Sequence, residues 1–271
     1  MVAPDVKTYW HILVMGIQNT LAYRVNFFCR AFFNLIPLFA AMSLWRAIFA
    51  GKSVEIAGYT LAQMLSYYLL VTIVEACTSV TEDDWQIAAD IKDGGLSQIL
   101  TRPIDYLHYR LCLFFSGRIV YSLAALVPVA AFVLWQIQYL LPPAGGVALG
   151  CFLLSLVLSA VLQFLLSYLI AMLAFWVLEI SSFTFILLAF ERLASGQMFP
   201  LDILPHWLER ALLWTPFPYG TFFPVSVFLG KAQGLALAQG LFLQLFWVAA
   251  LYAAARVLWR RGLRTYTIVG G

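Results

Sequence analysis

The residue types that most often carry chemistry in proteins are scarce in this sequence and form no catalytic pattern. The strongest acidic cluster is Glu82-Asp83-Asp84, and no histidine or cysteine motif accompanies it. A nucleophilic triad or a metal centre needs such partners at defined spacing. The three histidines are far apart and never at the H-x-x-x-H spacing that places two imidazoles on one helix face: His11, His108 and His206. We therefore expect no catalytic residues and no metal site.

One short segment looks like a phosphate-binding loop. Gly51, Lys52 and Ser53 match the end of the pattern G-x-x-x-x-G-K-[ST], but Arg46 stands where the pattern requires glycine. Such a loop binds phosphate because it leads from a strand into the N-terminus of a helix, whereas this triplet follows a long apolar run. We expect the match to be a coincidence, so that this chain binds neither ATP nor any other cofactor.

The composition indicates the environment in which the chain folds. Hydrophobic residues make up 63% of the 271 residues and charged residues only 11%. Soluble domains have about 45–50% apolar and about 25% charged residues, and an excess of this size cannot be hidden in a soluble core. The apolar runs are long and continuous, which favours membrane-spanning helices over the short alternating strands of a barrel. The predicted fold class is an all-α integral membrane protein.

Six apolar runs occur within a single predicted domain, residues 1–271, and most have about the 20 residues that a helix needs to cross a bilayer. Before the first run, residues 7–30 mix aromatic side chains with Lys7, Arg24 and Arg30. This mixture favours a helix that lies in the membrane interface, and a first span with a polar flank is the alternative. The predicted spans are 31–50, 59–80, 112–135, 146–176, 182–196 and 235–256.

The distribution of basic residues predicts the orientation. With six spans, eleven of the sixteen lysine and arginine residues fall on the side of the two termini. Basic residues of short loops stay in the cytoplasm, so both termini and residues 81–110 are expected there, and residues 197–231 outside. The predicted location is the inner (plasma) membrane, with the lipid bilayer as a partner and no nucleic acid. The five basic residues on the outer side are Arg46, Lys52, Arg192, Arg210 and Lys231.

The most highly charged loop, residues 81–110, also contains apolar residues at helical spacing. Gly94-Gly95 interrupts the pattern and Pro103 ends it, so we expect two short amphipathic helices. An apolar ridge with a charged rim suits the groove of a partner protein, and a plain surface hairpin is the alternative with equal support. The apolar residues are Trp85, Ile87, Ile91, Leu96, Ile99 and Leu100.

Polar residues inside predicted spans are costly in lipid and often functional. Glu75 lies near the end of the second span, where pairing with Arg118 would explain it without a functional role. Glu191 and Arg192 fall late in the fifth span and either pair near the outer side or flank a helix. None of these residues identifies a substrate. Two further amides lie in the fourth and sixth spans: Gln163 and Gln244.

Three segments of the chain together match the pattern of one known family. The stretch after the second span fits G-x-L-x-x-x-L-x-R-P through Gly94, Leu96, Leu100, Arg102 and Pro103. The other two are NTLAYRVNFF (19–28) with SLWRAIFAG (43–51), and SGQMFPLDILPHWLERALLWTPFPYGTFFPVSVFLG (195–230). In these features the chain resembles the ABC-2-type transporter permeases, and most closely the six-span subgroup that works with a separate ATPase and often a second permease.

The resemblance implies a role for each region. The fold would be the ABC-2 (type V exporter-like) transmembrane domain, with residues 7–30 as a connecting helix at the interface. Residues 85–103 would rest in a cleft of an ABC ATPase subunit, which would bind ATP and Mg²⁺. The contacts to the ATPase would come from Trp85, Ile91, Gly94, Leu96, Leu100, Arg102 and Pro103. Residues 197–228 would re-enter the outer leaflet and form an outer gate with Phe199, Pro200, Pro205, Trp207, Pro216 and Tyr219.

The function implied by the resemblance is that of a permease subunit of an ATP-driven exporter. Two such chains, alike or similar, would enclose the pathway, and apolar and aromatic walls would suit a bulky amphipathic substrate. The alternatives are a membrane channel or a non-catalytic membrane scaffold, although the sequence has no repeated filter segment. A membrane-embedded lipid or glycan transferase is a third class, for which the acidic cluster at 82–84 is the sole candidate site.

Overall fold

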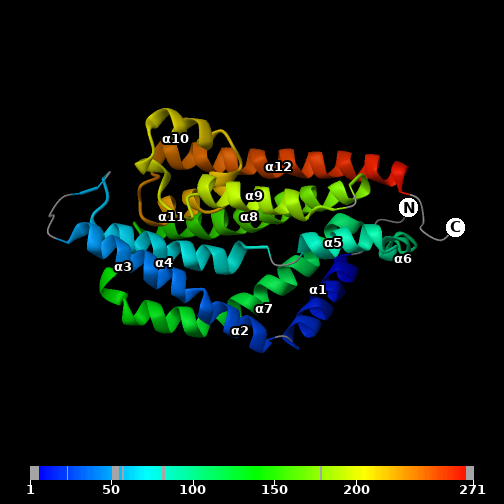
Figure 1. Ribbon diagram of the computed structural model, residues 1–271, viewed down its shortest axis with the longest axis horizontal. Helices are drawn as coiled ribbons and strands as arrows, with labels where there is room; N and C mark the ends of the chain where they lie inside the picture. Colours follow the sequence, from blue (N-terminus) through cyan, green and yellow to red (C-terminus); the bar gives the residue numbers. More distant parts are fainter. Residues whose placement is uncertain are drawn as a thin grey trace.

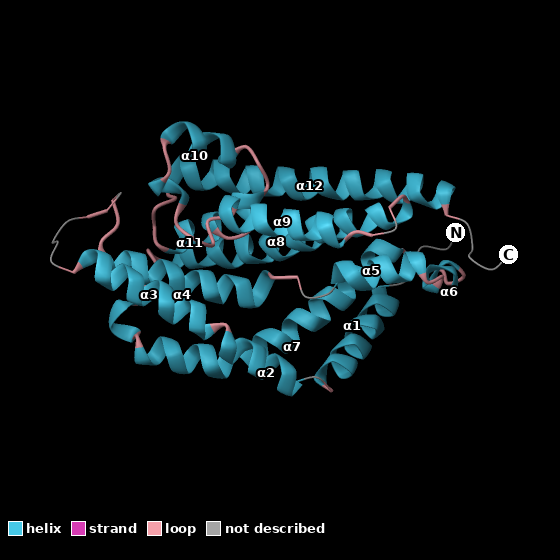
Figure 2. Cartoon of the chain, in the orientation of Figure 1, coloured by secondary structure: helices cyan, strands magenta, loops and turns pink. Residues whose placement is uncertain are grey.

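The chain folds into a bundle of helices, most of which follow the long axis of the molecule (Figure 1). The computed structural model describes residues 6–22, 24–50, 55–56, 58–80, 83–177 and 179–266. Every named element in these residues is helical (Figure 2). In chain order the elements are α1 (Val6–Leu21), α2 (Arg24–Phe33), α3 (Leu35–Phe49), α4 (Leu61–Thr78), α5 (Asp83–Lys92), α6 (Gly95–Leu100), α7 (Tyr106–Trp135), η1 (Ile137–Tyr139), α8 (Gly146–Ala171), η2 (Met172–Phe175), α9 (Ser181–Ala194), η3 (Leu201–Ile203), α10 (His206–Leu213), η4 (Phe217–Tyr219), α11 (Phe222–Phe228) and α12 (Gly234–Thr265).

Five helical stretches in the described residues are long and apolar enough to cross a membrane. Each overlaps a predicted span, although the first begins before residue 31, α7 begins well before residue 112 and α12 continues past residue 256. Hydropathy falls at these ends because of Arg110 and Arg256, but each arginine is paired inside the bundle, with Asp90 and Asp105 respectively. Helices α7 and α12 therefore extend beyond the predicted limits of their spans. The five stretches are Val25–Phe49, Leu61–Thr78, Tyr106–Trp135, Gly146–Phe175 and Gly234–Thr265.

The fifth predicted span, 182–196, corresponds to the short helix α9, which has 14 residues. At 1.5 Å per residue it is about 21 Å long, less than the ~30 Å of a hydrocarbon core. Its direction is set by its neighbours. Gln244 of α12 bonds to Ser155 of α8, and Gly262 of α12 lies against Phe175, so α8 and α12 are parallel. Because α8 and α12 are parallel, the chain between them must run back in the opposite direction, and α9 is the helix that does so (Figure 1).

The N-terminal boundary predicted at residue 30 is wrong. Helix α1 ends at Leu21, and α2, which begins at Arg24, leads into α3 to form the first membrane-length stretch. The error arose because Arg24 and Arg30 gave the segment an interfacial composition. Helix α1 packs against α7, where Ser116 Oγ donates to the carbonyl of Leu13 at 2.9 Å.

Two large apolar clusters fill the ends of the bundle. One, at what we call the α10/α11 end, joins α3, α4, α8 and α11 and includes Tyr67, Phe152 and Phe223. The other, at the α5/α6 end, joins α5, α7, α8 and α12 and includes Ile87 and Tyr168. A third, small cluster between them joins α2 and α7.

A buried amide network joins α8, α12 and η4. Gln244 Nε2 donates to the carbonyls of Ser155 and Tyr219 and to Ser159 Oγ, at 2.9–3.0 Å, and its Oε1 accepts from Ser155 Oγ at 3.0 Å. Such bonds contribute about 0.6 kcal/mol each inside membranes. The Gln244 side chain therefore has a structural role. Of Gln163 and Gln244, only Gln163 is left as a candidate for a functional site.

Candidate functional site

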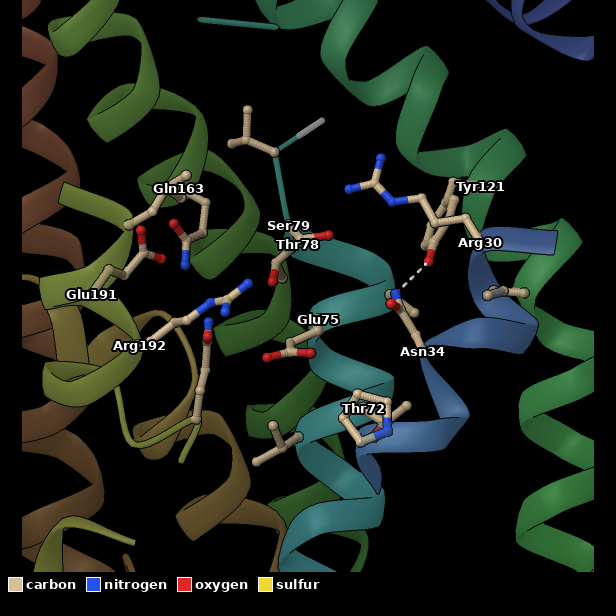
Figure 3. Close-up of a pocket in the computed structure, with 18 of the residues that line it drawn as sticks. Arg30, Asn34, Thr72, Glu75, Thr78, Ser79, Tyr121, Gln163, Glu191 and Arg192 are labelled. Carbon is tan, nitrogen blue, oxygen red and sulfur yellow. Dashed lines mark hydrogen bonds between the residues drawn. The ribbon is translucent and has the colours of Figure 1, made fainter. Parts of the chain in front are cut away.

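A cavity of about 750 Å³ lies between the two large apolar clusters. One wall is formed by α2, α3, α4 and α7, and the other by α8 and α9, as Figure 3 shows. The lining combines charged, amide and hydroxyl groups with apolar side chains, so it is unlike the uniformly apolar clusters on either side. The labelled lining residues are Arg30, Asn34, Thr72, Glu75, Thr78, Ser79, Tyr121, Gln163, Glu191 and Arg192.

The charged residues of the cavity come from three helices that are distant in sequence. Glu75 points from α4 into the space, and Arg192 extends from α9 towards it (Figure 3). Glu191 is only 8% exposed and lies beside the Gln163 side chain of α8. Arg30 lies on the opposite wall, on α2. The structure thus gathers residues that the sequence showed singly, and it places Arg192 in the cavity rather than in an outer loop.

Helix periodicity explains why these residues share the cavity. Lining residues on α4 and at its C-terminal cap are spaced by three and four residues: Thr72, Glu75 and Ser79. On α9 the lining residues have the same spacing: Thr184, Leu188 and Glu191. Residues at this spacing lie on one helix face. The expected pairing of Glu75 with Arg118 is not among the observed bonds; Arg118 Nη1 donates to Ser79 Oγ at 3.1 Å.

Two tyrosines of α4 bond to the backbone that follows α9, beside the cavity. Tyr67 donates its hydroxyl hydrogen to the carbonyl of Gly196, and Tyr68 donates to that of Met198, each at 2.5 Å. Gly196 has φ +83°, and a Cβ there would lie 2.7 Å from the Tyr67 hydroxyl oxygen, so glycine is required both by conformation and by space. These tyrosines could not be singled out from the sequence, because aromatic residues in a span are usually packing residues.

The loop predicted to contact an ATPase forms the expected pair of short helices, α5 and α6. Gly94 has φ +81° and turns the chain between them. Within the predicted contact set, Ile91 and Leu96 are buried in the chain's own apolar cluster, with Leu96 0% exposed. Their side chains are therefore not on the surface. Trp85 is exposed but lines the cavity. The residues of the set that are exposed at the end of the bundle are Leu100, Arg102 and Pro103.

A buried arginine connects this hairpin to the membrane-spanning bundle. Arg110 of α7 donates to the Gln86 carbonyl at 3.1 Å and to Gln86 Oε1 at 3.3 Å, and forms an ion pair with Asp90. The Tyr106 hydroxyl group donates to Asp90 at 2.7 Å and accepts from Arg110 Nε at 3.1 Å. These bonds fix α5 to the first turn of α7, so a force on the hairpin reaches that long helix.

Asp105 joins three helices at the same end. It caps α7 by accepting from the backbone N–H of His108 at 3.2 Å, and it pairs with Arg256 of α12. The Tyr9 hydroxyl group of α1 accepts a hydrogen bond from the Asp105 backbone N–H at 3.2 Å. Burial raises the pKa of Asp105, but the hydrogen bonds and charges of Arg256 and His108 outweigh it, and the net pKa is lowered.

A polar contact also ties the segments at the α10/α11 end. Lys231 Nζ pairs with Asp202 at 3.0 Å and lies 3.0 Å from the centre of the Tyr59 ring, while the Tyr59 hydroxyl group donates to Asp202 at 2.9 Å. Burial, followed by the charge of Asp202, raises the pKa of Tyr59 well above its usual value, so the phenol remains a donor. The contact holds the start of α4, η3 and the α11–α12 turn together.

The six residues predicted to form an outer gate do not line the cavity. Pro200, Pro216 and Tyr219 are buried, and the Tyr219 hydroxyl group donates to the carbonyl of Leu213 at 2.9 Å. Pro205 and Trp207 are exposed on the outer face of α10. Phe199 is half-buried beside Met198, which is itself a lining residue. The segment 199–219 thus lies next to the cavity rather than in it.

Among the described residues, no group of three or more histidine, cysteine, aspartate or glutamate residues could hold a metal ion. The triplet Gly51-Lys52-Ser53 and Glu82 lie outside the described residues, as do the side chains of Asp83 and Asp84.

The comparison with protein families agrees with this arrangement. The model of a family described as ABC-2 family transporter protein matches residues 35–270, which include α3, the four later membrane-length helices, α5, α6 and the segment 195–230. A comparison with curated proteins gave no match. The resemblance seen in the sequence is confirmed: the chain belongs to the ABC-2 family of transporter proteins.

Proposed function

We propose that this chain is the permease subunit of an ATP-driven ABC-2 exporter and contributes half of its translocation pathway. A separate ABC ATPase subunit binds and hydrolyses ATP, and a second permease, identical or similar, supplies the other half. The observation that carries the proposal is the α5–α6 hairpin, which exposes Leu100 at one end of the bundle and is fixed to α7 through Arg110.

The topology follows from the same proposal. The chain crosses the inner membrane six times, with α9 as the shortest crossing, and both termini are cytoplasmic. Basic side chains at the α5/α6 end support this orientation, since α12 ends there with Arg260, Arg261 and Arg264. Helix α1, with its exposed Trp10, lies along the cytoplasmic interface.

Coupling to ATP requires that the two states of the partner favour two arrangements of the permease. A ligand shifts an equilibrium only by its difference in affinity for the two states. ATP binding would draw two ATPase subunits together and move the two hairpins with them. Because Arg110 fixes α5 to α7, the movement reaches the wall of the cavity and changes the side from which it is open.

Purification from native membranes with and without a hairpin substitution tests this function. We expect an ABC ATPase to co-purify with the wild-type chain in mild detergent and to be lost with Leu100→Asp, because the exposed apolar side chain would be replaced by a charge at the docking surface. Leu96 is unsuitable for this test, since its burial would make the substitution unfold the hairpin. The readout is the ratio of ATPase to permease by quantitative mass spectrometry.

Thr265→Asp is the matched control, because Thr265 is exposed at the end of α12 and receives the same added charge at the same end of the bundle. It should retain the ATPase. Absence of an ATPase from the wild-type preparation at every detergent concentration would contradict the proposal and favour a channel or a non-catalytic scaffold. A second permease in the preparation would show that the pathway is heterodimeric.

A further inference from the structure

The cavity is lined by equal numbers of positively and negatively charged side chains. Arg30 of α2 and Glu75 of α4 lie on one wall, and Glu191 and Arg192 of α9 lie on the other (Figure 3). Each wall therefore has one guanidinium group and one carboxylate. Among the described residues, none of these four side chains forms an ion pair within 4.0 Å. The charges thus balance without direct contact, which leaves polar groups of both signs for a ligand.

This balance determines which net charge a ligand can carry. Uncompensated charge is costly at membrane depth, so a ligand with a net positive or negative charge would be bound less favourably than an electrically neutral one. Among neutral ligands a zwitterion fits best, because its anionic group can bond to a guanidinium group and its cationic group to a carboxylate. Such charge-assisted bonds are about twice as strong as bonds between uncharged groups.

The rest of the lining indicates what else the ligand carries. Pro37, Leu38, Val71, Leu166 and Leu188 give both walls apolar surface beside the charged side chains. A volume near 750 Å³ lies within the range of about 300–1,000 Å³ that holds drug-sized ligands, so there is room for more than a small polar group. Apolar surface next to balanced charges matches a molecule with a zwitterionic head group and an apolar tail.

The geometry points to a zwitterionic amphiphile as the substrate class of this cavity, with its head group held between the α2/α4 wall and the α9 wall. The inference rests on the proposed function, since it names what the pathway carries. It also revises the sequence-based expectation of purely apolar and aromatic walls, because the charged residues that the structure brings together select a head group with both charges. A membrane phospholipid and a soluble single-chain amphiphile share this chemistry.

Four amphiphiles with the same octyl tail and different head groups test the inference. They are octylphosphocholine, which is zwitterionic, octyltrimethylammonium, octyl sulfate and the uncharged octyl glucoside. Each would be offered below its critical micelle concentration to the permease, purified with whatever ATPase it retains, in a non-ionic amphipol, with protein-free amphipol subtracted. We expect saturable binding of octylphosphocholine that is about tenfold or more tighter than binding of the other three.

Removing one charge of either sign should change the preferred head group in opposite directions. Arg192→Gln leaves one negative charge in excess and should shift the preference towards the cation by about tenfold, whereas Glu191→Gln leaves one positive charge in excess and should shift it towards the anion by a similar factor. Arg30→Gln, at an exposed position on the other wall, should act as Arg192→Gln does, and it provides the same test if Arg192→Gln fails to fold.

Thr72→Val is the matched control, since Thr72 also lines the cavity and its hydroxyl group bonds to the Tyr68 carbonyl of its own helix, at 3.0 Å. It should keep the wild-type preference. Equal binding of all four amphiphiles, tighter binding of any of the other three than of octylphosphocholine, or a preference that is the same in the arginine and glutamate variants would overturn the inference.

Two further outcomes separate the possible sources of the ligand and the two levels of the proposal. Competition by phosphatidylcholine vesicles would identify a membrane lipid as the source, and binding without such competition would identify a soluble amphiphile. If octylphosphocholine fails to bind while the ATPase still co-purifies, the substrate class is wrong and the permease function stands.

Discussion

At the N-terminus of α7, the Asp105 carboxylate satisfies a backbone donor and pairs with Arg256. It joins two helices that are separated by about half of the sequence, and α1 approaches the same point through Tyr9. In the sequence Asp105 was merely part of a charged loop. Its partners could not be predicted because they depend on how α1, α7 and α12 meet in space.

The first prediction concerns pH and this carboxylate. Asp105→Ala should lower the free energy of unfolding by about 1–2 kcal/mol at pH 7, the usual effect of losing a helix cap, and Asp105→Asn by less, because asparagine also caps. Since the folded pKa of Asp105 is lowered, its contribution is present above its unfolded value near 3.9 and is lost as the pH falls through the folded value.

Thermal unfolding in detergent, followed by tryptophan fluorescence, measures the difference between Asp105→Ala and the wild type. The difference should shrink as the pH is lowered from 7 to below about 4. A difference that stays constant over this range would show that the ionised carboxylate does not contribute as the geometry indicates.

At the scale of elements, the α5–α6 hairpin depends on its attachment to α7. The guanidinium group of Arg110, which is 8% exposed, bonds to both the backbone and the side chain of Gln86 and pairs with Asp90. Among the described residues, no other buried ion pair joins the hairpin to a membrane-spanning helix. The stability of α5 should therefore depend strongly on this arginine.

The second prediction follows from that attachment. Arg110→Met should increase amide hydrogen exchange in residues 83–92, because Asp90 loses its partner, and breaking such a pair costs about 3 kcal/mol. Arg110→Lys should have a smaller effect, since one ammonium group cannot reproduce the forked contacts. Adding Asp90→Leu to Arg110→Met should restore part of the protection. Unchanged exchange in Arg110→Met would mean that apolar packing alone holds α5.

The sequence predicted most elements but not their contacts. Long apolar runs correctly located five membrane-length helices, and Gly94-Gly95 correctly predicted the break between α5 and α6. Which apolar side chains of the hairpin face inward could not be predicted, because Leu96 and Leu100 have the same character and only packing against α7 and α8 distinguishes them. The fifth predicted span, 182–196, was already the shortest of the six, as α9 is in the structure.

At the scale of the whole molecule, the cavity is the feature that sequence reasoning could not assemble. Glu75 and Arg192 were noted singly, but they lie on α4 and α9, more than one hundred residues apart, and α8 and α2 complete the walls. At the α10/α11 end, Tyr67 and Tyr68 bond to the backbone that follows α9. Opening of the proposed pathway at that end would have to move this contact.

The most direct test of this account is the accessibility of the cavity from each side of the membrane. A cysteine at Thr72, in a chain whose four native cysteines are replaced by alanine, would be exposed to a membrane-impermeant thiol reagent in sealed vesicles of known orientation. We predict reaction from the cytoplasmic side without ATP and from the opposite side with ATP and vanadate, with the switch abolished by Leu100→Asp. Equal reactivity in both nucleotide states, from whichever side, would contradict the account.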